Sequence, residues 1–96
     1  MNYRIVIIDE AKFDFRKALF YYKDINPKLA IRFNQSFKES IKTIKEKPEL
    51  FQIRFENVRI KMLKTFPYLI HFTIYDNLIV IKAIYHSSRD SKLNIF

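Results

Sequence analysis

Hydrophobic positions in the first half of the chain follow two different periods. Residues 3–8 are rich in isoleucine and valine and alternate weakly with polar residues, which predicts a strand. Beyond Asp9 the apolar residues recur at steps of three and four, the spacing of one helical face. This stripe consists of Ala11, Phe15, Ala18, Tyr22 and Ile25. The pattern therefore predicts an amphipathic helix that Asp9 caps and that ends near Asp24 and Ile25.

A second amphipathic helix is predicted from Pro27 to about Lys47. Asn26 is a favoured N-cap, Pro27 suits the first helical position, and Pro48 ends the helix. Its apolar stripe consists of Ala30, Phe33, Phe37, Ile41 and Ile44. The connection between the two helices is so short that they must run antiparallel as a hairpin.

The second half of the chain alternates with a period of two, which predicts strands. The predicted strands are 58–64, 68–75 and 78–86, and the connection before them, 49–57, includes a short extended piece at 51–55. Asp76 and Asn77 have the length and residue types of a two-residue hairpin turn. The last strand is apolar on both faces except at Lys82 and His86, which is typical of a central strand.

This order of elements predicts an α+β fold. The 96 residues are 49% hydrophobic and contain no linker or repeat, so we expect a single domain over residues 1–96. The helix hairpin must pack on one face of a mostly antiparallel sheet, because neither layer can bury its apolar face alone.

The amino-acid composition excludes several classes of protein. The chain has no cysteine, so disulfides and thiolate metal sites are excluded, and its two histidines do not cluster with carboxylates at ligand spacing. Without glycine it has no phosphate-binding loop of the dinucleotide or NTPase type. We therefore expect no metal and no cofactor. Turns that need a positive φ must use other residues, and the candidates are Asn26, Asn57, Asp76 and Asn77.

Charge and hydropathy indicate the compartment and the partner. No apolar run is long enough to span a membrane, and the N-terminus lacks the cleavage site of a signal peptide, so a cytosolic location is expected. The net charge of +8 is spread over both halves of the chain. It favours an acidic partner, which is nucleic acid, an anionic protein segment or a membrane surface.

The parity of the last strand predicts where its polar side chains point. Lys82, Ile84 and His86 share one face, and Ile81, Ala83 and Tyr85 share the other. If the helices cover the more uniformly apolar face, Lys82 and His86 point outwards. Arg59 and Lys61 then join them across the sheet in a concave basic patch.

Such a patch suits the cleavage of a phosphodiester. That reaction needs a base, an acid and cations that stabilise the oxyanion. His86 is the candidate base or acid, Tyr85 the candidate proton donor, and Arg59, Lys61 or Arg89 the candidate clamp.

A plainer interpretation assigns the same residues to structure. Lys82 then extends along the sheet and His86 ends the strand. Tyr85 and His86 are adjacent and diverge on a regular strand, which separates two of the candidate catalytic groups. His71 lies in mid-strand between apolar neighbours and is expected to be a partly buried structural residue.

Several segments together resemble a known family. They are Ala18-Leu-Phe-Tyr-Tyr22, Ala30-Ile-Arg-Phe33, Ile44-Lys-Glu-Lys-Pro48, Arg59-Ile-Lys-Met-Leu-Lys64, Phe66-Pro67-Tyr68-Leu-Ile70 and Ile84-Tyr85-His86-Ser-Ser-Arg89-Asp90. With them the chain resembles the RelE/ParE superfamily of toxins from type II toxin–antitoxin (plasmid stabilisation) modules, and it is most similar to the ParE branch. The resemblance implies a β-α-α-β-β-β fold and a cytosolic toxin that a cognate acidic antitoxin neutralises.

The resemblance leaves three functions open. The first is a ParE-like toxin that inhibits DNA gyrase by protein binding. The second is a RelE-like, metal-independent endoribonuclease that cuts mRNA on the ribosome with His86, Arg89, Arg59, Lys61 and Tyr85. The third is an inactive module that only binds its antitoxin. Whether the chain is an enzyme stays open at this point.

Overall fold

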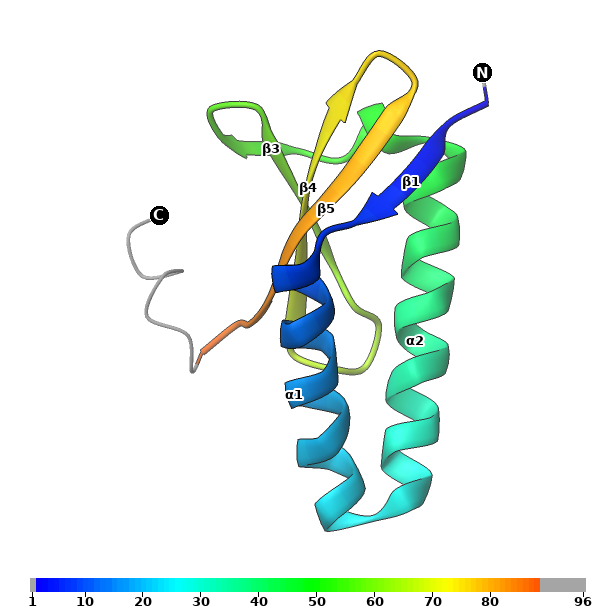
Figure 1. The fold of residues 1–96 in the computed structure, drawn as a ribbon, viewed down its shortest axis with the longest axis vertical. Coiled ribbons are helices and arrows are strands. Elements are labelled where there is room, and N and C mark those ends of the chain that lie inside the picture. The colour runs from blue at the N-terminus through cyan, green and yellow to red at the C-terminus, as the bar shows by residue number, and fades with distance from the viewer. Residues whose placement is uncertain (1, 89–96) are drawn as a thin grey trace.

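The computed structural model describes residues 2–88 and has an α+β architecture. Its elements are β1 (Arg4–Ile7), α1 (Asp9–Ile25), α2 (Pro27–Glu46), a short 3-10 helix η1 (Pro48–Leu50), β2 (Ile53–Phe55), β3 (Val58–Met62), β4 (Tyr68–Tyr75) and β5 (Leu78–His86). The strands form one sheet in the order β1-β5-β4-β3-β2, in which only the β1–β5 pair is parallel. The two helices run antiparallel beside each other (Figure 1). The predicted fold is confirmed, and β2 is the short extended piece at its edge.

The helix ends follow from local chemistry. The Asn26 side chain accepts a hydrogen bond from the Lys28 amide at 3.0 Å, and Pro27 occupies the first position of α2, as predicted. The predicted cap of α1 is wrong, because Ile8 takes the N-cap position. Asp9 is instead the first helical residue, where a carboxylate is stabilised by the positive end of the helix dipole.

The core lies between the helix hairpin and one face of the sheet, which we call the helix-covered face. Phe33 of α2 is fully buried at its centre. Its ring packs against Phe15 of α1 at 5.6 Å between centroids, and against Phe66 and Tyr68 at 5.4 and 5.3 Å. The hairpin and the sheet therefore share one set of aromatic contacts.

A β-bulge at Lys82 reverses the parity predicted for β5. Ile81 and Ala83 pair with two consecutive residues of β4, so Lys82 is an extra residue. Consequently Ile81 and Ile84 both lie in the core, although their numbers differ in parity. Lys82 is exposed, as predicted, but the predictions that Ile84 shares its face and that His86 points away from the helices are wrong for this reason.

Three of the residues that the structure describes have a positive φ, in a chain that has no glycine. Asp76 has a φ of 54° in the predicted turn between β4 and β5. In the turn between β2 and β3 it is Glu56, and not the predicted Asn57, that has a φ of 47°. Thr65, in the loop between β3 and β4, has a φ of 79°, which is unusual for a β-branched residue.

Candidate functional site

The two cations of β3 point towards the helix-covered face. Arg59 and Lys61 lie opposite Phe72 and Ile70 of β4, and both of these residues are fully buried in the core. Directly opposed residues in an antiparallel pair extend to the same side of the sheet. The expected basic patch on the face away from the helices, which we call the outer face, therefore lacks Arg59 and Lys61.

Arg59 connects β3 to the segment that follows α2. Its Nη1 atom donates hydrogen bonds to the carbonyl oxygens of Glu49 at 3.0 Å and Phe51 at 2.7 Å. The Lys61 ammonium lies 5.8 Å from the centre of the Phe51 ring. These contacts hold η1 and the segment that leads into β2 against β3.

Tyr85 and His86 lie on opposite faces of the sheet, as their adjacency predicts. The His86 ring packs edge-on against the buried Tyr68 at 5.1 Å between centroids, on the helix-covered side. Its Nδ1 atom accepts a hydrogen bond from the Ser88 amide at 3.2 Å. The Tyr85 ring packs against His71 on the outer face at 4.9 Å.

His71 is the centre of an outer-face ring cluster that also contains Phe55 and Tyr85. The side chain is only 3% exposed, and its ring lies 6.2 Å from that of Phe55. Burial, and secondarily the charge of Arg54, lowers the pKa of His71 from 6.5 to about 4. The imidazole is therefore neutral at physiological pH, and it is more deeply buried than the sequence predicted.

The predicted catalytic residues are not brought together in the part of the chain that the structure describes. Arg59, Lys61 and His86 lie towards the helices and Tyr85 lies on the outer face, while Arg89 lies outside the described residues. Strand β4 separates the β3 cations from His86. Over residues 2–88 no three His, Cys, Asp or Glu side chains are grouped so that they could hold a metal ion. Neither α1 nor α2 is long and apolar enough to cross a membrane.

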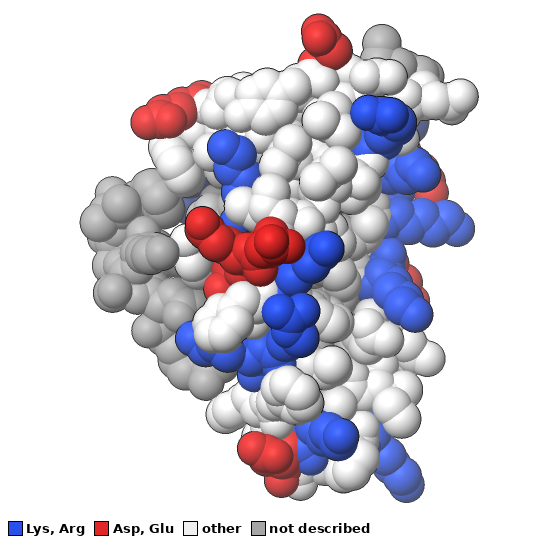
Figure 2. Space-filling model, viewed as in Figure 1, with Lys and Arg blue, Asp and Glu red and all other residues white. Residues whose placement is uncertain are grey.

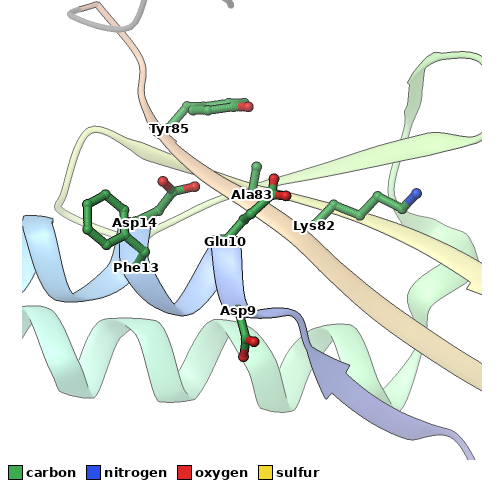
Figure 3. Close-up of a pocket in the computed structure, with 7 residues that line it drawn as sticks. All are labelled: Asp9, Glu10, Phe13, Asp14, Lys82, Ala83 and Tyr85. Atoms are coloured by element: carbon green, nitrogen blue, oxygen red, sulfur yellow. The ribbon is translucent and has the colours of Figure 1, made fainter.

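Sequence reasoning missed a pocket of about 360 Å³ between α1 and β5, which we call the α1–β5 pocket. It is lined by Asp9, Glu10, Phe13 and Asp14 from α1 and by Lys82, Ala83 and Tyr85 from β5 (Figure 3). Asp14 accepts a hydrogen bond from the Ile84 amide at 3.1 Å and so fixes the helix beside the strand. The signal in the sequence was Phe13, an aromatic residue outside the buried stripe of its helix.

The α1–β5 pocket differs in charge from its surroundings. Three of its lining residues, Asp9, Glu10 and Asp14, are acidic, although the chain has a net charge of +8. The side chains of Glu10 and Asp14 point towards β5, and that of Asp9 points away from it (Figure 3). Figure 2 shows acidic side chains gathered over the start of α1, with basic side chains below them and along α2. The pocket is thus a local acidic site on a basic protein.

Comparison with known proteins identifies the family. The model of the ParE toxin of type II toxin–antitoxin systems, parDE, matches residues 5–91. A solved structure described as the chromosomal ParDE TA system from P. aeruginosa has a TM-score of 0.77 and 19% sequence identity, and the match covers 88% of this chain and 95% of that chain. At this identity the structural likeness establishes the fold. No curated protein sequence matches the chain. Because the family model covers nearly its whole length, the chain belongs to the ParE family of toxins from type II toxin–antitoxin systems.

Proposed function

We propose that this toxin acts in the cytoplasm by binding DNA gyrase and inhibiting it, and that it does not cut RNA. Membership of the family makes it the toxin of a toxin–antitoxin pair, so a cognate antitoxin is its partner. The identity of the target, the acidic character of the antitoxin and the cytoplasmic location are parts of the proposal. The net charge of +8 supports an acidic antitoxin, because opposite charges accelerate and orient association.

The observation that supports binding over catalysis is the position of the candidate catalytic groups. A general acid and a general base must both come within hydrogen-bonding distance of the same reacting phosphodiester. Tyr85 and His86 point to opposite faces of the sheet, and the Arg59 guanidinium binds two carbonyl oxygens of its own chain. This arrangement favours a surface that recognises a protein.

Two reactions with the purified chain test the proposal. In the first, gyrase supercoils relaxed plasmid, and we expect the chain to inhibit supercoiling and to increase the amount of cleaved plasmid. In the second, ribosomes translate a reporter mRNA whose ends are mapped by primer extension, and we expect no new ends. Addition of the antitoxin to the first reaction is expected to restore supercoiling. Cut mRNA with unaffected gyrase would establish the endoribonuclease, and no effect in either reaction would leave a module that only binds antitoxin.

Substitution of the C-terminal candidates separates the two mechanisms in cells. We expect His86→Ala and Arg89→Ala to leave growth inhibition within about threefold of the parent, because neither residue has a catalytic task under the gyrase proposal. Incorporation of labelled thymidine and methionine, followed after induction, shows whether DNA synthesis or translation stops first. A steep loss of toxicity with an unchanged circular dichroism spectrum would instead support RNA cleavage.

A further inference from the structure

We propose that the α1–β5 pocket is a docking site for the antitoxin, which inserts one apolar side chain into it beside a lysine or arginine. The inference rests on the toxin–antitoxin pairing of the family and is independent of the gyrase target. It assigns to the antitoxin a segment of defined chemistry, in which a large apolar residue and a cationic residue are close neighbours.

The pocket exists because β1 covers only part of the edge of β5. The parallel pairing of the two strands ends at Ile7 and Ile81, and the Ile8 amide then donates to the Ile81 carbonyl at 3.2 Å. The chain turns into α1 at this point, while β5 continues to His86. The hollow beside the rest of β5 is therefore formed by a helix and the small side chain of Ala83 (Figure 3).

Phe13 makes the pocket suitable for an apolar side chain. Its ring is 58% exposed although phenylalanine is among the most strongly apolar residues, and the Lys17 ammonium lies 5.8 Å from its centre. A side chain that enters the pocket contacts both Phe13 and Ala83 and removes apolar surface from water on both partners. Full burial of a large apolar side chain strengthens binding by about 10- to 100-fold.

The carboxylates of the pocket select the charge of the occupant. The carboxylates of Glu10 and Asp14 lie on the side of α1 that faces β5 (Figure 3), and among the described residues that line the pocket only Lys82 is basic. A nucleic acid backbone is repelled by such a group, whereas a lysine or arginine beside the apolar residue is attracted to it. The site is therefore suited to a peptide segment with local positive charge, whatever the net charge of the whole antitoxin.

The first test compares two phenylalanines of α1. Phe13 lines the pocket, and Phe20, on the same helix, is 55% exposed and does not line it. Each is replaced by serine, and the dissociation constant for the antitoxin encoded beside the toxin gene is measured by biolayer interferometry. We expect Phe13→Ser to weaken binding about 10- to 100-fold and Phe20→Ser to weaken it less than about threefold. Equal effects would overturn the proposal, and thermal unfolding confirms that both variants fold.

The second test reverses charge and observes the pocket directly. Glu10→Lys is expected to weaken binding about tenfold, and Asp24→Lys, at the other end of α1, about twofold or less. In a sample labelled at alanine methyl groups, the Ala83 signal is expected to shift in the complex more than that of Ala30 on α2. An unchanged Ala83 signal in a formed complex would show that the antitoxin binds elsewhere.

Measurement of gyrase inhibition by the same variants distinguishes failure of the docking proposal from failure of the gyrase proposal. If Phe13→Ser keeps its affinity for the antitoxin but no longer inhibits gyrase, the pocket belongs to the target interface and the docking proposal is wrong. If the parent chain does not inhibit gyrase at all while Phe13→Ser loses affinity for the antitoxin, the target assignment fails and the docking site stands.

Discussion

The two faces of the sheet differ in their rings: the helix-covered face carries most of them, and the outer face has a smaller cluster that is organised differently. On the helix-covered face the rings surround Phe33 and join both helices to β4. On the outer face the ring cluster of Phe55, His71 and Tyr85 joins strands to one another around a neutral imidazole. The basic residues of β3 belong to the first face, where Arg59 binds the segment after α2. The difference teaches that a strand rich in cations need not present a basic surface, because register decides which face each cation joins.

The largest expected effect concerns the helix-covered face. Phe33→Ala removes a fully buried ring and leaves a cavity between the helices and the sheet, so we expect a loss of about 3–5 kcal/mol in the free energy of unfolding. Phe55→Ala on the outer face removes a partly exposed ring and is expected to cost less than half as much. Urea denaturation of both variants measures the difference. Equal losses would show that the two faces contribute similarly to stability.

The second prediction concerns the buried imidazole of the outer face. Because the pKa of His71 in the folded chain is about 4 and its ordinary value is 6.5, the unfolded chain binds a proton first as the pH falls. The stability supplied by the neutral imidazole is complete above pH 6.5 and is lost between there and pH 4. Between pH 7.5 and pH 5 we expect this group alone to lower the free energy of unfolding by about 2 kcal/mol.

Replacement of His71 by glutamine, which does not titrate, isolates this contribution. Urea denaturation at both pH values gives a pH-dependent loss for each protein, and the other ionisable groups contribute equally to both losses. We expect the loss to be smaller in His71→Gln by about 2 kcal/mol. If both proteins lose the same stability, His71 is hydrated in the folded state and the outer-face ring cluster does not exclude water.

Much of the fold was predictable because its signals are local. Asn26 and Pro27 fix the helix hairpin through one side-chain bond and one restricted φ, and the alternation of 68–75 and 78–86 reproduced the bounds of β4 and β5. The cap of α1 was predicted one residue too late, since Asp9 is equally acceptable as a cap and as a first helical residue.

The candidate site was not predictable because it depends on non-local pairing. The extra residue in β5 is visible only in its register with β4, and without it the side chains from Ala83 to His86 are assigned to the wrong face. The carbonyl partners of Arg59 lie eight and ten residues away, in η1 and just after it. The α1–β5 pocket unites the start of a helix with the end of the last strand, which no sequence period connects.

The third prediction tests whether Arg59 is structural. Arg59→Met keeps the apolar stem but removes both hydrogen bonds to the segment after α2, so we expect a loss of about 1 kcal/mol in the free energy of unfolding. Toxicity per folded molecule is expected to stay the same, since the guanidinium has no partner role in our proposal. Loss of toxicity without loss of stability would make Arg59 a catalytic candidate again. Lys61→Met is the matched control, because it removes a cation from the same face of β3.

The smallest expected effect concerns the loop that connects β3 to β4 beside α2. Thr65 has a φ of 79°, where a β-branched residue is strained by about 1–2 kcal/mol. Glycine removes this strain but increases the entropy of the unfolded chain, so we expect Thr65→Gly to stabilise the fold by about 0.5 kcal/mol. Asp76→Gly is the control, because aspartate tolerates its φ of 54° better and is expected to gain less. The adjacent Lys64 carbonyl accepts a bond from the Ser36 hydroxyl at 2.7 Å, which holds this loop against α2. If thermal unfolding shows Thr65→Gly to be destabilised, the threonine side chain must itself hold the loop. The contacts of the helix-covered face would then include this loop as well as the aromatic rings.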